Sequence, residues 1–431
     1  MKGMTVRSGA DRVFIGIDLS DDFSQISYCT VDEPRTMSMG SGETRMCIPT
    51  MLAKRYGEAA WSFGEEAYEQ SAADEAFPVD RLVERARNGA AVEVEAVDYD
   101  PTDLLALFMK KCLGRLSAIT PIEKVAAIMI SVEDPDEQMI KILDQVVRTL
   151  RLKAERVFYQ SHAESAFNYL MHQSMDVRAQ DVCVCDMRQQ GLVVTLYSQN
   201  VHTKPQVMIM QERVYDHFLP ESFEGIKNPE GRKKMKDQEF LHILQANIDD
   251  RIVSSVFLLG DGFEGDWSRE SLKYICNGRR AFRGNNLYSK GACYGARGKV
   301  NPSPADREMV FLGPDKVKAN IGMNVYRKGR ESYMALLDGG KNWYDLSRKC
   351  ELLLESERRI QFIITPLNGK EVRTVSMFLK GIPERKRRST RVLLELRMLS
   401  ESRIQAVVTD MGFGEFFEPS GMQWEMEFKT D

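Results

Sequence analysis

The fold is decided by the stretch RVFIGIDLSDDFS, residues 12–24, and by a related stretch, DVCVCDMRQQGLVV, residues 181–194. Each is an apolar strand that ends in an aspartate, Asp18 or Asp186, and continues through a polar turn into a returning strand. Each copy can therefore open one half of a duplicated α/β domain. In such a unit the turn amides can hold an anion while the carboxylate holds Mg²⁺ through water. The alternative is two ordinary hairpins with an aspartate in each turn.

The composition is that of an ordinary soluble protein of two or three domains. The chain has 431 residues, is 43% hydrophobic and 28% charged, and carries a net charge of −4. This balance argues against a general nucleic-acid binder. The eight cysteines form no CxxC pair, and the five histidines lack the spacing of a zinc site. Without a signal peptide or a membrane-spanning apolar run, we expect a cytoplasmic protein with reduced thiols and no membrane partner.

Strands alternate with helices between the two stretches. The run VAAIMISV, residues 125–132, is typical of a strand that is covered on both faces. Helical periods are predicted around it at 104–116, 135–150 and 161–172. This alternation indicates an α/β architecture.

A glycine-rich turn follows late in this region. The strand at 256–259 runs into GDGFEG, residues 260–265, which matches G-x-G-x-x-G. A dinucleotide site would need an acidic residue about twenty positions on, where arginines occur instead. We therefore interpret Gly260 and Gly262 as a strand-to-helix turn beside a nucleotide base.

The helical periods end near Pro302-Ser303-Pro304. Beyond it, short strands are expected at 320–326, 349–354, 360–365, 374–379, 392–398, 404–409 and 424–428. Their regular spacing predicts an all-β sandwich. We expect an α/β domain at 1–301, a linker at 302–313 and the sandwich at 314–431.

This arrangement resembles the DnaK-type heat-shock chaperones, in which an actin-like ATPase domain, a duplicated ribonuclease H-like fold, precedes a peptide-binding sandwich. IGIDL at 15–19 resembles the first phosphate motif, and Asp186 stands where the second begins. The later motifs follow in the same order: VFLLGDG at 256–262, KGACYGA at 290–296, MVFL at 309–312, FLKGIP at 378–383 and IQAVVTD at 404–410. FLKGIP is the most specific match.

The resemblance implies a site for ATP or ADP with Mg²⁺. The implied nucleotide-binding residues are Asp18, Ser20, Asp186, Arg188, Gly191, Gly260 and Gly262, with both aspartates holding the metal through water and serving hydrolysis in an active enzyme. The resemblance also implies a protein or peptide partner on the sandwich. The residues expected to line that groove are Ile321, Met323, Val325, Tyr326 and Phe362, and the alternative is that they form the sandwich core.

The chain departs from the family at the groups that serve hydrolysis. Ser20-Asp21-Asp22 replaces a Gly-Thr-Thr turn, and residues 187–190 replace three glycines. Asp80 stands where the catalytic lysine is expected, and Ser161 where the catalytic glutamate is. The outer subdomain near 199–250 is short, and no helical lid is expected.

These replacements oppose phosphate binding. One like-charge contact at about 4 Å and an effective dielectric near 20 costs on the order of 4 kcal/mol. Arg188 can offset part of this cost by binding phosphate, unless it is a surface residue. We therefore expect a chaperone-like pseudo-ATPase that binds a protein partner and binds nucleotide weakly or not at all. The alternatives are an active chaperone ATPase that uses Asp18 and Asp186, and an actin-type filament former.

Overall fold

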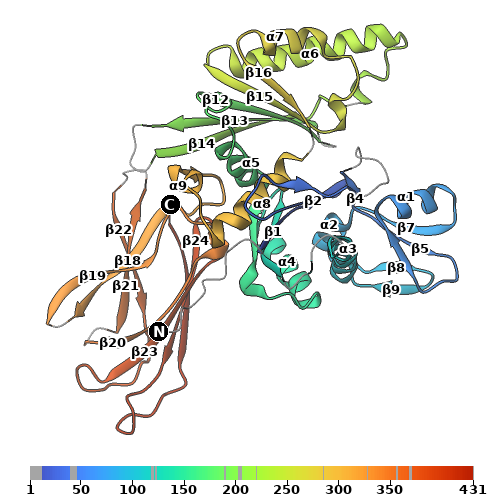
Figure 1. Ribbon diagram of the computed structural model, residues 1–431. Helices are drawn as coiled ribbons and strands as arrows, with labels where there is room; N and C mark the ends of the chain where they lie inside the picture. Colours follow the sequence, from blue (N-terminus) through green and yellow to red (C-terminus); the bar gives the residue numbers. More distant parts are fainter. Residues whose placement is uncertain are drawn as a thin grey trace, which may run out of the picture. The chain divides into compact units, whose positions relative to one another are not determined.

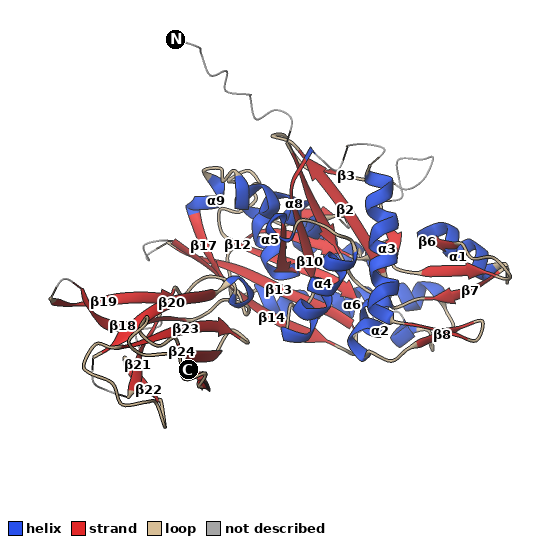
Figure 2. Ribbon diagram, turned by 90° about the horizontal axis from the view of Figure 1, so that it is seen from below, coloured by secondary structure: helices blue, strands red, loops and turns tan. Residues whose placement is uncertain are grey.

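The computed structural model describes residues 12–430, apart from 39–45, 118–120, 122–123, 189–190, 202–205, 220, 285, 328, 356–357 and 368–370. The chain divides into two compact units, and the boundary between them in the sequence lies between Phe311 and Leu312. The first is an α/β unit and the second is built of antiparallel strands (Figures 1 and 2). The expected order of an α/β domain followed by a β-rich domain is confirmed.

The first stretch forms the centre of a mixed sheet with the order β11-β10-β1-β2-β3. Its strands are β1 (Val13–Asp18), β2 (Phe23–Cys29), β3 (Arg35–Thr36), β10 (Val125–Val132) and β11 (Val157–Ser161), with β4 (Ile48–Pro49) paired to β2. Strand β1 is parallel to β10 and antiparallel to β2. Every residue of β1 is buried, which explains the unbroken apolar run in the sequence.

The second stretch forms the centre of another sheet with the same pattern, β16-β15-β12-β13-β14-β17. Its strands are β12 (Asp181–Arg188), β13 (Gly191–Asn200), β14 (Gln206–Tyr215), β15 (Val253–Leu259), β16 (Arg280–Arg283) and β17 (Met309–Leu312). Again the first strand of the copy is parallel to one neighbour and antiparallel to the other. The two sheets therefore repeat one topology. Strand β17 falls in the segment expected to be the interdomain linker.

Helices cover both sheets. Helices α3 (Pro101–Leu116) and α4 (Glu137–Thr149) share an apolar core with β1 and β10. Helices α6 (Pro229–Ile248) and α7 (Arg269–Cys276) share another with β12, β13 and β15. Asp100 caps α3, since its carboxylate accepts hydrogen bonds from the backbone nitrogens of Thr102 and Asp103. Pro101 occupies the first helical position.

Two helices, α5 (His162–Met171) and α8 (Leu287–Val300), cross in direct contact. Helix α8 lies on β1, β10 and β2, while α5 shares its core with β12 (Figure 1). The crossing depends on glycine, because a Cβ at Gly291 would lie 1.8 Å from the Ser165 carbonyl oxygen. A Cβ at Gly16 of β1 would likewise lie 2.1 Å from the Cys293 backbone nitrogen of α8.

A small lobe follows the first hairpin. It contains α1 (Gly64–Ala72), α2 (Leu82–Asn88), the three-stranded sheet β6-β5-β7 and the β8-β9 hairpin. The strands of this lobe are β5 (Leu52–Arg55), β6 (Trp61–Phe63), β7 (Ala76–Val79), β8 (Val92–Val94) and β9 (Val97–Tyr99). Far along the chain and outside the lobe, the short helix α9 (Ala305–Glu308) precedes β17.

The second unit consists of two four-stranded antiparallel sheets, β19-β18-β21-β22 and β20-β23-β24-β25. The strands are β18 (Ala319–Arg327), β19 (Arg330–Leu337), β20 (Ser347–Leu354), β21 (Arg359–Pro366), β22 (Arg373–Phe378), β23 (Thr390–Met398), β24 (Arg403–Asp410) and β25 (Gln423–Lys429). Phe362 and Phe428 stack across the two sheets with ring centroids 5.1 Å apart. All seven expected strands are present, and β19 was missed because its apolar residues are mostly at least partly exposed.

None of the helices in the described residues is long and apolar enough to cross a membrane.

Candidate functional site

Asp18, the last residue of β1, and Asp186, two residues before the end of β12, lie in one group of side chains within the first unit. On the first strand, Asp18 Oδ1 lies 2.8 Å from His162 Nε2, and both side chains are buried. Neither atom makes a well-aligned hydrogen bond among the residues that the structure describes. The two side chains are therefore in close contact without a hydrogen bond between them. It places an imidazole against the carboxylate that the sequence assigned to Mg²⁺.

His162 links Asp18 to the second half of the unit. It is the first residue of α5, directly after Ser161, and its ring stacks on Tyr288 of α8 with centroids 4.4 Å apart and planes 11° from parallel. The Tyr288 hydroxyl donates a hydrogen bond to Asp186 Oδ2 at 2.9 Å. Burial, followed by the charge of Asp186, raises the pKa of Tyr288 well above its usual value. The phenol therefore stays protonated and can keep donating.

Asp186 has a second donor. Arg188 Nε donates to Asp186 Oδ2 at 2.7 Å, and the other end of the guanidinium pairs with Glu133, which follows β10. The side chains of Arg188 and Asp186 are only 18% and 12% exposed. Arg188 is thus committed to two carboxylates, one from each half of the unit.

We call these six residues the cleft cluster: Asp18, His162, Tyr288, Asp186, Arg188 and Glu133. They do not fit a hydrated Mg²⁺ ion, because a guanidinium and a phenol occupy Asp186 and an imidazole lies on Asp18. A cation would have to displace these donors and face the positive charge of Arg188. Nowhere in the described part of the chain do three or more His, Cys, Asp or Glu side chains gather as metal ligands.

The first turn is also occupied by internal contacts. Ser20 Oγ donates to the Phe23 carbonyl at 2.7 Å. Asp21 Oδ1 accepts from the backbone nitrogens of Val83 and Glu84, both at 3.0 Å, and so caps the start of α2. Asp21 therefore points toward α2. The sequence predicts instead that its negative charge faces a triphosphate.

The second turn keeps its glycine for a packing reason. Gly191 pairs with Arg188 across the β12–β13 hairpin, and its φ is +127°. A Cβ there would lie 2.4 Å from the Tyr215 carbonyl oxygen of β14. Gln189 and Gln190 lie outside the described residues.

The late glycine turn packs on the end of β12. Gly260 has a φ of +94°, and a Cβ on it would lie 2.4 Å from the Met187 carbonyl oxygen. A Cβ on Gly262 would lie 2.5 Å from Met187 Cγ. Both glycines are therefore explained by close contact with Met187, whatever else the turn binds.

The two positions that replace the catalytic lysine and glutamate have structural partners. Asp80 pairs with Arg85 at 3.1 Å. Ser161 caps α5, where its Oγ accepts from the Glu164 backbone nitrogen at 3.2 Å.

The residues expected to line a peptide groove divide into two groups. Ile321, Met323 and Phe362 are buried in the core of the sandwich and are unavailable to a peptide. Val325 is half-buried and Tyr326 is 62% exposed, near the end of β18. Ile321 and Met323 lie two residues apart on one face of β18, and Phe362 lies on β21, so these three belong to the core, which is the alternative that the sequence left open.

Sequence reasoning missed His162 and Tyr288. Both are polar rings in the first turn of a helix, and His162 adjoins the position at which a catalytic glutamate was sought. That adjacency was the available signal for His162. Nothing in the sequence indicated that Tyr288 would lie between His162 and Asp186.

Comparison with known protein families gives two matches. Residues 33–314 match the family described as "Family of unknown function (DUF5716) C-terminal". Residues 316–430 match the "Domain of unknown function (DUF8552)". No curated protein matches the chain. Because the first match covers more than half of the chain, the protein belongs to the family of unknown function DUF5716, C-terminal.

Proposed function

We propose that the protein is a chaperone-like pseudo-ATPase, an actin-like domain that no longer uses nucleotide, joined to a sandwich, and that it acts by binding other proteins. The repeated sheet order supports the actin-like part of this proposal. The crossing of α5 and α8 between the two sheets supports it as well, since it joins the two halves tightly at glycine contacts.

The cleft cluster is the observation that carries the proposal. In a nucleotide-binding member, the two hairpin aspartates would face a hydrated metal and the phosphates. Here His162 lies against Asp18, and Tyr288 and Arg188 donate hydrogen bonds to Asp186. Opening this site to ATP would break a buried ion pair and a buried hydrogen bond. Such losses cost several kcal/mol, and each ~1.4 kcal/mol lowers affinity tenfold.

Hydrolysis would need groups that these positions do not supply. Asp80 and Ser161 have structural partners, and neither is a cation or a base near the cleft aspartates. Contacts that join side chains from both halves of the unit instead suit a scaffold whose two halves stay in one arrangement. The sandwich and the small lobe are then the surfaces left for a partner.

ATP turnover and holdase activity test the proposal together. Release of phosphate from Mg²⁺-ATP by the wild type should equal that of the Asp18→Asn/Asp186→Asn variant. Suppression of aggregation of heat-denatured citrate synthase should occur and be independent of ATP. Turnover that the double variant abolishes would favour the active chaperone, and ATP-dependent sedimentation would favour a filament former; either result would refute the proposal.

A further inference from the structure

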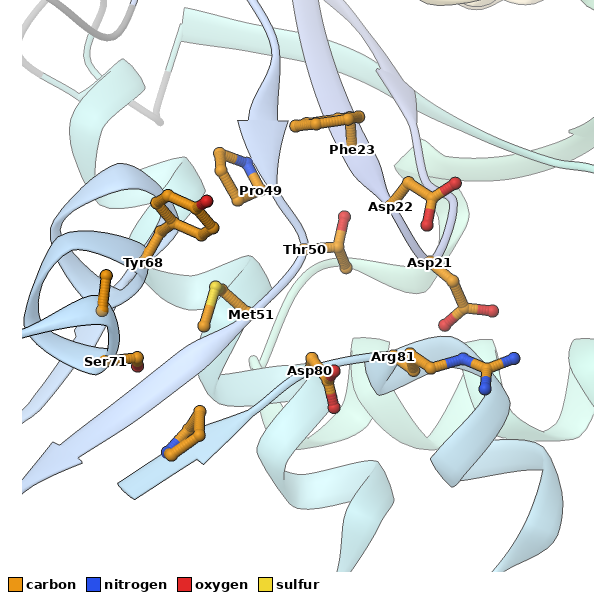
Figure 3. A pocket seen from close by; sticks show the side chains of 12 residues that line it. Asp21, Asp22, Phe23, Pro49, Thr50, Met51, Tyr68, Ser71, Asp80 and Arg81 are labelled. Carbon is orange, nitrogen blue, oxygen red and sulfur yellow. The ribbon is translucent and has the colours of Figure 1, made fainter. Parts of the chain in front are cut away.

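The small lobe holds an open pocket of about 760 Å³ beside the first hairpin turn. Figure 3 shows its two sides. The lining is Asp21, Asp22, Phe23, Pro49, Thr50, Met51, Tyr68, Ser71, Ala72, Pro78, Asp80 and Arg81. The residues come from the turn after β1 and the start of β2, from the end of β4 and the link between β4 and β5, from α1, from β7, and from the segment that joins β7 to α2.

One side of the pocket is apolar and aromatic. Figure 3 places Phe23, Pro49, Tyr68 and Met51 along it. The Phe23 and Tyr68 side chains are 41% and 59% exposed, although both are large rings. Exposed rings in a concave site offer flat surfaces for the aliphatic stem or the planar head of a ligand side chain.

The other side is acidic. Three aspartates and one arginine line the pocket. That arginine, Arg81, already pairs with Glu84. Asp21 also caps α2, and Asp80 also pairs with Arg85, which is outside the lining. Burial, followed by the charge of Asp21, raises the pKa of Asp22, so a cation in the pocket would relieve unfavourable charge. Phosphate would meet repulsion at the same place.

We infer that this pocket binds a basic side chain, arginine or lysine, presented by an extended segment of a partner protein. The stem lies along the Phe23 and Tyr68 rings, and the cationic head reaches Asp22 and Asp80. The inference rests on the proposed function for the ligand being a polypeptide. The negative charge of the lining then predicts that the bound side chain of this polypeptide is a cation. The phosphate-turn and lysine positions carry carboxylates here because they meet a cation.

Isothermal titration calorimetry of the full chain with the peptide acetyl-Gly-Arg-Gly-amide tests the inference. The same peptide with citrulline in place of arginine is the neutral isostere. The arginine peptide should bind in the millimolar range, about fivefold or more tighter than the citrulline peptide, and added salt should weaken it. Asp22→Asn and Tyr68→Ala should each weaken binding about fivefold, by losing the charge and the ring respectively. Asp98→Asn, an exposed aspartate on β9 outside the pocket, is the matched control and should leave binding unchanged.

Three outcomes would overturn the inference: equal binding of the two peptides, unchanged binding by Asp22→Asn and Tyr68→Ala, or no saturable binding of the arginine peptide. Each leaves the proposed function standing, because that function is tested separately with nucleotide and a denatured protein.

Discussion

Removal of one hydroxyl group from the cleft cluster, by Tyr288→Phe, should destabilise the first unit without disturbing its packing. The ring keeps its stack on His162, and only the 2.9 Å bond to Asp186 is lost. A hydrogen bond to a charged group contributes about 1.5–3 kcal/mol. Arg188 still holds Asp186, so the loss should fall at the lower end, about 1.5–2 kcal/mol.

Urea unfolding followed by tryptophan fluorescence and circular dichroism measures this loss, with the transitions of the two units fitted separately. Tyr68→Phe is the control. The Tyr68 side chain is 59% exposed, and removal of its hydroxyl should change the unfolding free energy by less than about 0.5 kcal/mol. Equal losses in the two variants would refute the claim that Tyr288 holds a buried carboxylate.

The pH dependence gives this prediction a second test. The pKa of Tyr288 is raised in the folded chain by burial and then by Asp186. The stability that this residue contributes is therefore fully present below about pH 10, the unfolded pKa, and falls above it by about 1.4 kcal/mol per pH unit. The difference between wild type and Tyr288→Phe should shrink between about pH 9 and pH 11. A constant difference over that range would contradict a buried, protonated phenol.

Two further substitutions test the fold. Gly291→Ala should destabilise the first unit by more than about 3 kcal/mol in urea unfolding, because its Cβ would lie 1.8 Å from a backbone oxygen of α5. Gly114→Ala on α3 is the control: its Cβ would meet nothing within 4 Å, and the change should be neutral or stabilising. Similar effects of the two substitutions would refute the close crossing of α5 and α8. Arg385→Met should cost the sandwich about 3–5 kcal/mol in urea at neutral pH, since it leaves the Asp410 carboxylate buried without its cation, with the backbone donors of Gly412 and Ser420 still in place. Arg385 lowers the pKa of Asp410, so this stabilisation is present above about pH 4 and is lost as the pH falls, and a wild-type sandwich no more sensitive to acid than the variant would contradict it.

Much of the fold follows from local sequence pattern. The apolar runs at β1, β10 and β12 predicted strands, and the run at β10 predicted one that is covered on both faces; these strands lie inside the two sheets. Regular spacing likewise predicted seven strands of the second unit. Register was harder, since alternation alone left open whether Ile321 and Phe362 face a peptide or the core, and the structure places both in the core.

The candidate site was predicted only in part. The sequence identified Asp18 and Asp186 and predicted that their surroundings oppose phosphate binding. It did not reveal which side chains contact these two carboxylates, because His162 and Tyr288 are distant in sequence and meet only when α5 and α8 cross. Gly260 and Gly262 show why glycine spacing is ambiguous. Their spacing suggests a nucleotide, but close contact with Met187 also accounts for both glycines.

The acidic turn illustrates how a correct observation can have an unexpected result. Asp21 and Asp22 were expected to repel a triphosphate. The structure uses Asp21 to cap α2 and leaves Asp22 on the wall of a pocket with exposed rings. No sequence pattern could show that α1 and the Asp80 segment would close around the same turn, since they come from separate parts of the chain.

The central claim is that side chains of the protein itself fill the place of a nucleotide. A thermal melt of the purified chain with Mg²⁺ and ATP, with Mg²⁺ and ADP, and with Mg²⁺ alone tests this most directly. A nucleotide present at about a hundred times its Kd would add about 2.7 kcal/mol of stability. We predict that the three melts coincide at millimolar nucleotide. A clear upward shift with ATP or ADP would contradict the claim and show that the cleft cluster opens to a ligand.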